Sequence, residues 1–234
     1  MVPAMNGIPL YVALYLVFLF STTCHEAAHA LVAKKGGDDT AYSLGHVTLD
    51  PMPHITRSPW GMVIAPLIGL FYMGYPLGWA SVPYDAHWGQ RHPRRRALMS
   101  LAGPAANFAI ALVCIGILRV LVEAGVFHLS GTGVRSGFVV LSEGVAQNSP
   151  LAAIAFLLSR SFELNMLLGA FNLIPLPPLD GSSVAEGFLP RVLGSFYDRL
   201  RDIPGHEFLG WMAASQVFGY LVGPIDRLVV LLGF

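Results

Sequence analysis

The stretch IPLYVALYLVFLFSTTCHEAAHALV, residues 8–32, decides the fold class of this chain. It is long enough to cross a bilayer and is apolar apart from three hydroxyl residues and the motif HEAAH at positions 25–29. Two histidines and a glutamate inside the hydrocarbon region of a membrane cost several kcal/mol unless something compensates them. A bound metal ion is the compensation that this spacing indicates.

The motif carries the elements of a metal site. On a helix, positions i and i+4 share one face, so His25 and His29 can offer their imidazoles to the same ion. Glu26, the next residue round the helix, can reach a water on that ion and act as a general base. The alternative is a set of buried polar side chains satisfied by their neighbours. The combination of HExxH with a membrane helix favours the metal site.

Composition supports a membrane protein. Of the 234 residues, 54% are hydrophobic and only 12% are charged, which is too apolar for a soluble domain of this size. The formal net charge is zero, so nothing indicates a nucleic-acid partner; the expected partner is the lipid bilayer. The N-terminus lacks a basic n-region, so we interpret the first apolar segment as retained. We expect one transmembrane domain over residues 1–234, without an appended regulatory domain.

Windows of about 20 apolar residues indicate membrane helices. They predict spans at 8–32, 97–122, 151–174 and 208–232. A further window at 60–79 holds two prolines and four glycines and is either re-entrant or spanning. Alternation around Gly45 in the stretch 41–49 predicts a small β-hairpin or edge strand at the membrane interface. The expected fold class is an all-α polytopic membrane protein, a helical bundle with this hairpin.

A catalytic zinc ion requires a third protein ligand, with water in the fourth position. The window 151–174 is followed by three prolines and then Asp180-Gly181. Prolines break the helix and expose backbone, which places an acid at the end of an apolar helix. Asp180 alone would be an ordinary helix-end aspartate. Together with HExxH it becomes the candidate third ligand.

These residues resemble the site-2 proteases, a family of intramembrane zinc metalloproteases. Three motifs match: HEAAH at 25–29, Gly103-Pro104-Ala105-Ala106-Asn107, and the run from Asn172 to Gly181. The stretches 44–51 and 78–80 are similar to the small prokaryotic branch. The resemblance implies that His25, His29 and Asp180 bind Zn²⁺ and that Glu26 is the catalytic base.

Two asparagines lie in apolar windows, Asn107 and Asn172. Interhelical hydrogen bonding is the structural explanation for both. The resemblance also implies that Asn172 contacts substrate backbone near the metal. We therefore predict that both are substrate-binding or supporting residues.

A parity argument predicts the membrane topology. His25 and His29 lie near Lys34 and Lys35, and the positive-inside tendency places that end of the helix in the cytoplasm. Asp180 follows the window 151–174 and must reach the same depth, so that window must also run toward the cytoplasm. An odd number of crossings must then lie between it and the window 8–32. Two windows lie between them, and 60–79, with its prolines and glycines, is the better candidate for a re-entrant segment. We expect a multi-pass protein of a prokaryotic cell membrane with its active site toward the cytoplasm.

The function predicted from these observations is zinc-dependent intramembrane proteolysis: an HExxH endopeptidase that hydrolyses peptide bonds of membrane-embedded, single-span substrates. The alternative is a membrane metal transporter or sensor that uses the same His/His/Asp site. A transporter needs acidic or histidine residues in several helices along a path, and the other windows nearly lack them. Glu26 would also have no task in a transporter.

Overall fold

A computed structural model describes residues 8–129, 139–141 and 150–231. The helices and strands are α1 (Ile8–Lys35), α2 (Thr40–Ser43), α3 (Pro51–Arg57), the π-helix η1 (Trp60–Ile64), α4 (Ala65–Met73), α5 (Ala86–Arg91), α6 (Pro93–Glu123), β1 (Phe127–Leu129), β2 (Val139–Leu141), α7 (Pro150–Asn172), α8 (Asp180–Phe188), α9 (Pro190–Arg201) and α10 (His206–Leu231). Within these residues the molecule is mainly helical, as its composition predicted.

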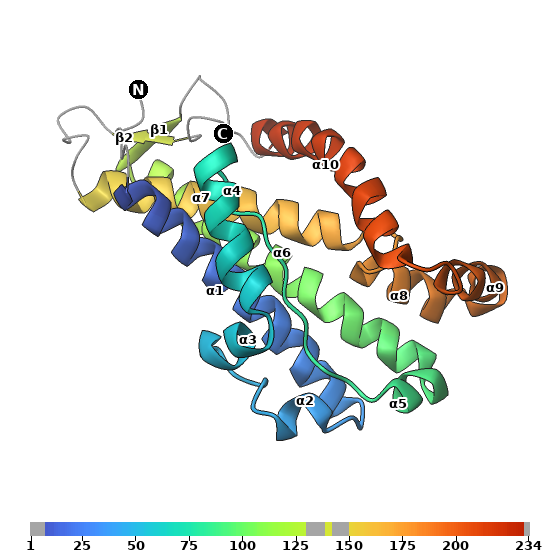
Figure 1. Ribbon diagram of the computed structural model, residues 1–234. Helices are drawn as coiled ribbons and strands as arrows, with labels where there is room; N and C mark the ends of the chain where they lie inside the picture. The colour runs from blue at the N-terminus through green and yellow to red at the C-terminus, as the bar shows by residue number, and fades with distance from the viewer. Residues whose placement is uncertain (1–7, 130–138, 142–149, 232–234) are drawn as a thin grey trace.

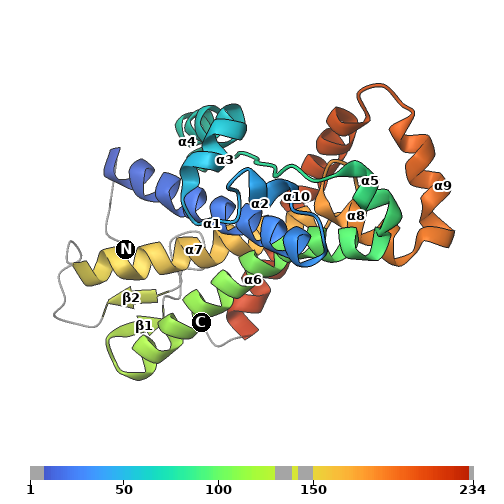
Figure 2. The same ribbon diagram turned by 90° about the horizontal axis from the view of Figure 1, so that it is seen from below.

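Three long helices form the centre of the molecule. Helix α6 packs against both α1 and α7, and the two ribbon views show the three side by side (Figures 1 and 2). Each of the three is long and apolar enough to cross a membrane. They coincide with the windows 8–32, 97–122 and 151–174. Helix α10 corresponds to the window 208–232, whose last residue lies outside the described part of the chain, and it does not meet the same criteria.

The largest apolar core lies between α6 and α7. Its buried residues are Ala111, Cys114, Ile115, Leu118, Phe127, Ala155, Phe162, Leu167 and Ile225, the last contributed by α10. Large apolar side chains also cover the outside: Leu112 on α6 and Phe71 on α4 are 68% and 77% exposed. An apolar core together with an apolar exterior is what a helix bundle in lipid requires.

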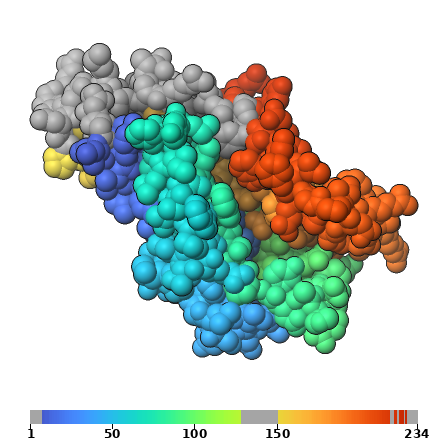
Figure 3. All heavy atoms as spheres, in the orientation of Figure 1, coloured from blue at the N-terminus to red at the C-terminus, as the bar shows by residue number. Residues whose placement is uncertain are grey.

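The window 60–79 doubles back on itself. Helix α4 ends at Gly74, whose φ of 70° suits glycine, and the chain then returns in extended form. The amide of Trp79 donates to the carbonyl of Gly61 at 3.1 Å, which pairs the returning segment with the start of η1. Figure 3 shows this segment, in teal, on the outside of the bundle beside α1.

The segment 39–84, which connects α1 to α5, begins and ends near the C-terminal end of α1. The Asp38 side chain accepts a hydrogen bond from the amide of Asp85 at 2.9 Å. The Gly36 carbonyl accepts from the Trp88 indole and the Arg95 guanidinium, both at 3.1 Å. The segment 39–84 therefore leaves and returns to one end of the bundle, which is the geometry that the parity argument required.

The hairpin expected at 41–49 is wrong. Residues 40–43 form the single turn α2, and the rest of the stretch consists of turns and bends. The Asp38 carboxylate accepts from the Thr40 amide at 3.0 Å and from its hydroxyl at 2.6 Å, which starts a helical turn instead of a strand. The strands that the structure does contain, β1 and β2, pair antiparallel elsewhere, beyond the end of α6.

Helix α7 also carries an ion pair that the sequence argument passed over. Arg160 Nη1 lies 2.6 Å from Glu163 Oε2, and each side chain is 14% exposed. Pairing within one turn neutralises both groups where neither could remain alone at low cost. Glu163 is thus an acidic residue in the window 151–174, in contrast to the expectation that the other windows nearly lack acidic residues and histidines.

Candidate metal centre

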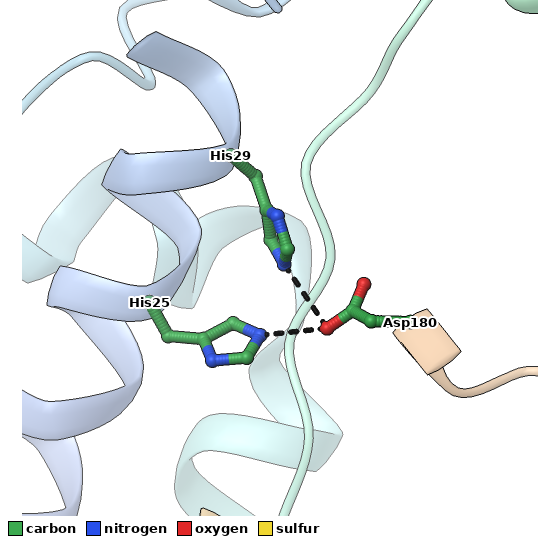
Figure 4. A group of neighbouring side chains, drawn as sticks. All are labelled: His25, His29 and Asp180. Carbon is green, nitrogen blue, oxygen red and sulfur yellow. Dashed lines mark hydrogen bonds and ion pairs between the residues drawn. The ribbon is translucent and has the colours of Figure 1, made fainter. Parts of the chain in front are cut away.

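Three side chains from two distant parts of the chain converge between α1 and α8. The Nε2 atoms of His25 and His29 lie 3.1 and 3.3 Å from Oδ2 of Asp180 (Figure 4). Their possible ligand atoms all lie within 4.8 Å of one another. The two imidazole rings are nearly perpendicular, at 84°, so both can direct Nε2 at one point. Two imidazoles and a carboxylate make a donor set that suits zinc.

The opposite nitrogen of each imidazole is held by a hydrogen bond. His25 Nδ1 lies 2.6 Å from the Asn107 side-chain oxygen, and His29 Nδ1 lies 2.7 Å from the Met99 carbonyl. Both acceptors are on α6. Because each can only accept, Nδ1 carries the proton and Nε2 keeps its lone pair for a metal. Helix α6 thus orients both histidines of α1.

The hydrogen-bond chain continues into α7. The Asn107 amide donates to the Asn165 side-chain oxygen at 2.8 Å, and the Asn165 amide donates to the Ser21 hydroxyl at 2.8 Å. Asn107 and Asn165 are fully buried. A polar chain of this kind joins all three long helices beside the ligands and fixes their relative positions.

Gly103 leaves the space beside the ligands open. A Cβ atom at this position would overlap the Nε2 atoms of both His25 and His29. A side chain there would therefore occupy the place where the ligand atoms converge. The absence of a side chain fits a site that holds an ion.

Glu26, the residue after His25, is buried and has an unused acceptor atom. Its side chain is 4% exposed, and its Oε2 atom is buried with no hydrogen-bond partner among the described residues. An uncompensated buried carboxylate oxygen is costly. A metal ion with water beside it would supply the missing partner, so the residues present fit the group.

The third ligand arrives at the start of α8. The prolines between α7 and α8 end the preceding helix, and Asp180 opens the next one, where its charge suits the helix N-terminus. Asp180 thus brings a carboxylate oxygen to the point at which the two imidazole Nε2 atoms converge.

Asn172 lies apart from this network. Its side-chain amide donates to the Leu168 carbonyl of its own helix at 2.9 Å. Its substrate-contacting role stays a prediction. Conversely, sequence reasoning missed Asn165, Ser21 and the Met99 carbonyl. A third asparagine in an apolar window was the available signal for Asn165, whereas nothing in the sequence marks a backbone carbonyl as a partner.

The fold and the site define a helical membrane protein with a buried zinc centre of the metallopeptidase type. The chain belongs to peptidase family M50, the site-2 protease family, whose sequence model matches residues 13–201. The resemblance drawn from the motifs is thereby confirmed. No solved structure matches the chain.

Among its relatives is the Bacillus subtilis protein named "Putative zinc metalloprotease YwhC". It is 34% identical over 185 residues, which cover 78% of this chain and 72% of that protein. Proteins named "Putative zinc metalloprotease Rip2" match as well. The one from Mycolicibacterium smegmatis is 28% identical over 76% of this chain and 60% of its own length; the one from Mycobacterium tuberculosis H37Rv is 32% identical over 74% and 55%. These names and the His/His/Asp set identify zinc as the metal.

Proposed function

We propose that this protein is a zinc-dependent intramembrane endopeptidase that cleaves peptide bonds of membrane-embedded, single-span substrates. One observation carries the proposal. His25, His29 and Asp180 converge beside a helix that is apolar enough to cross a membrane, and Oε2 of Glu26 on that same helix has no hydrogen-bond partner among the described residues. The names of the relatives support a zinc protease.

His25, His29 and Asp180 hold the ion, and the hydrogen bonds from α6 keep both imidazoles in the ligating tautomer. Bound zinc supplies Lewis acidity, which polarises a scissile carbonyl and lowers the pKa of water. Glu26 accepts the proton of the attacking water and returns it to the leaving amine, so the peptide bond breaks with no net proton change. This division of tasks uses each polar group that the motif places in the bilayer.

The substrate helix has to unwind before it can react. A carbonyl in an intact helix accepts the i+4 amide and is shielded by the helix backbone. The chain between α7 and α8 contains Pro175, Pro177 and Pro178, which interrupt the helix beside Asp180. The Pro175 and Leu176 carbonyls already accept hydrogen bonds, from the Tyr197 hydroxyl and the Leu179 amide. An extended substrate would therefore pair in a strand-like manner with the remaining backbone of this segment. We place the active site toward the cytoplasmic side of a prokaryotic cell membrane, where the basic end of α1 belongs.

The test compares the wild type with Glu26→Gln in proteoliposomes that contain a panel of single-span substrates. Zinc content is measured in the same preparations. We expect Glu26→Gln to retain zinc, because the three ligands are intact, and to lose about 10²–10⁴-fold in cleavage rate. Asp180→Ala should lose both zinc and activity. Cleavage by Glu26→Gln at the wild-type rate would contradict the mechanism.

Metal transport is the competing function, and the same vesicles address it. Among the described residues, His25, His29 and Asp180 are the only group of three or more potential ligands close enough to share an ion. A transport path needs ligands at several depths. Zinc uptake that depends on His25 without any cleavage of the panel would favour transport over proteolysis.

A further inference from the structure

The carboxylate of Glu186 on α8 is bound by arginines from two other helices. Arg96 Nη2 of α6 donates to Oε2 at 2.7 Å. Arg201 of α9 donates from Nη1 to Oε2 at 2.9 Å and from Nη2 to Oε1 at 2.8 Å. The Arg201 contact is bidentate, the geometry that fixes both distance and orientation. We call these three residues the Glu186 cluster.

The Glu186 cluster is shielded enough for its pairing to matter. The Arg96 and Glu186 side chains are 13% and 15% exposed, whereas Arg201 is 40% exposed. Arg96 Nε is buried without a partner among the described residues, so the Arg96 cation depends on Glu186 for its compensation. Removing one member of a shielded pair leaves the other charge uncompensated, which is costlier than losing an exposed pair.

The cluster lies on the same short helix as the third metal ligand. Helix α8 runs only from Asp180 to Phe188, so Glu186 and Asp180 move as one rigid unit. Six residues of helix separate them by about 9 Å along the axis. Whatever fixes Glu186 along and around the axis of α8 therefore also fixes the Asp180 carboxylate against the two histidines.

Arg96 connects the Glu186 cluster to the part of α6 that orients His29. Arg96 lies three residues before Met99 on α6, and the Met99 carbonyl holds Nδ1 of His29 at 2.7 Å. The bond between Arg96 and Glu186 thus joins the helix that orients His29 to the helix that supplies Asp180. These two ligands are 151 positions apart in sequence, so their alignment depends entirely on contacts between helices.

Close packing alone does not fix α8 in this position. Gly187 lies against the Pro93 carbonyl and Ala97, and Gly181 lies against the Leu173 carbonyl. Such glycine contacts bring backbones together but offer few directional restraints. Three charge-assisted hydrogen bonds to one carboxylate do provide direction, and they resist both sliding and rotation of the helix.

We propose that Glu186 is a positioning residue for the zinc site: Arg96 and Arg201 hold it, and it sets helix α8 so that Asp180 meets the ion held by His25 and His29. The proposal rests on the zinc site and not on peptide cleavage. Its test can therefore fail while the proteolytic function stands, and the reverse also holds.

The decisive comparison uses Glu186→Gln with Asp198→Asn as its matched control. Asp198 also binds Arg201, at 2.7 Å, but it lies on α9 with Arg201 and is 72% exposed. Zinc affinity is measured by chelator competition on the purified full chain in lipid nanodiscs. We expect Glu186→Gln to weaken zinc binding by about 10–100-fold, the usual effect of removing a group that orients a ligand. Asp198→Asn should bind zinc like the wild type.

Two further measurements separate positioning from general stability. The visible absorption of the Co²⁺-loaded protein reports the ligand set; in Glu186→Gln it should shift toward that of Asp180→Ala. The melting temperature of the metal-free protein reports the fold. A lowered melting temperature with unchanged zinc affinity and unchanged Co²⁺ absorption would overturn the proposal, because Glu186 would then act only in stability.

A second variant decides the matter if Glu186→Gln does not fold. Arg201→Gln removes two of the three hydrogen bonds at a more exposed position and leaves Arg96 paired with Glu186. We expect a smaller loss of zinc affinity, in the same direction, with a partial shift of the Co²⁺ absorption. Wild-type zinc affinity in Arg201→Gln would likewise overturn the proposal.

Discussion

Gly103 on α6 lies against the imidazoles of His25 and His29. Gly103→Ala should weaken zinc binding, because the added Cβ overlaps both Nε2 atoms. Overpacking of this kind costs about 1–3 kcal/mol, or about 10–100-fold in affinity. Zinc affinity by chelator competition is the measurement. The result would show that the residues beside the ligands, as well as the ligands, define the centre.

Gly116→Ala is the control for this change. Gly116 lies on the same helix, and a Cβ there meets nothing within 4 Å. Alanine is favoured over glycine in a helix by about 1 kcal/mol, so this variant should bind zinc normally and be no less stable. Equal zinc affinity in the two variants would mean that α6 lies farther from the histidines than the structure places it.

Residues whose chemistry depends on local spacing could be predicted from the sequence. His25, Glu26 and His29 follow from one turn of helix, and Asp180 follows from the need for a third ligand. Gly103 was recognised only as part of a motif, because its role arises from the approach of α6 to α1. Asn165 was missed for the same reason: its side-chain partners Asn107 and Ser21 are on other helices, and no spacing within α7 reveals them.

Between elements, Asn107 on α6 fixes the orientation of the His25 imidazole on α1. Asn107→Leu keeps the approximate volume but removes the acceptor at His25 Nδ1, so zinc affinity should fall by about 10–100-fold. Asn172→Leu serves as the control, because the Asn172 amide bonds only within its own helix. If Asn172→Leu kept zinc and lost cleavage, the predicted contact with substrate would gain support. Equal zinc affinity in Asn107→Leu and the wild type would contradict the orienting role.

The ionisation of Glu186 makes the attachment of α8 depend on pH. Burial would raise the pKa of this carboxyl, but Arg201 and Arg96 outweigh it and hold the pKa below its ordinary value of 4.5. A carboxyl with a depressed pKa stabilises the fold above pH 4.5, and this contribution is lost as the pH falls through its folded value. At pH 7 the free energy of unfolding of the metal-free wild type should therefore be larger than that of Glu186→Gln by about 1–3 kcal/mol.

Melting temperatures of the two proteins, measured from pH 7 down to acid, test this expectation. The difference between them should begin to narrow below about pH 4.5 and close once the pH falls below the lowered pKa of the Glu186 carboxyl in the folded protein. A difference that stayed constant over the whole range would show that the Glu186 side chain stabilises α8 by packing and not by charge.

The stretch 41–49 shows why an alternating pattern did not become a strand. A period of two predicts a strand only where a neighbouring strand can accept its hydrogen bonds. Here the Asp38 carboxylate starts a turn at Thr40, and the ring of Tyr42 packs under the Lys34 ammonium, 3.0 Å from the ring centroid. These contacts with the end of α1 therefore stabilise the start of the segment as a helical turn. Local pattern could not predict this contact.

For the whole molecule, the membrane topology was predicted from the need for one metal site and not from hydropathy alone. Five apolar windows would place the HEAAH motif and Asp180 at opposite faces of a bilayer, and one ion cannot bridge about 30 Å. The folded-back segment 60–79 resolves the conflict, since Asp38 and Asp85 meet at one end of the bundle. That residues 60–79 enter and leave the membrane on one side stays a prediction, and it rests on the requirement for a single metal site.

Accessibility from the two sides of the membrane tests this arrangement directly. Single cysteines are introduced at Asp39 and Gln90, after Cys24 and Cys114 have been replaced. Both positions are exposed, and they lie before and after the segment 60–79 in the sequence. A third cysteine at Ala124, just beyond the far end of α6, marks the opposite face. In oriented vesicles, an impermeant maleimide should label Asp39→Cys and Gln90→Cys from the same side and Ala124→Cys from the other. Labelling of Asp39→Cys and Gln90→Cys from opposite sides would mean that residues 60–79 cross the bilayer. Asp180 could then reach His25 and His29 only if another segment between them also crossed, and the re-entrant assignment would be lost.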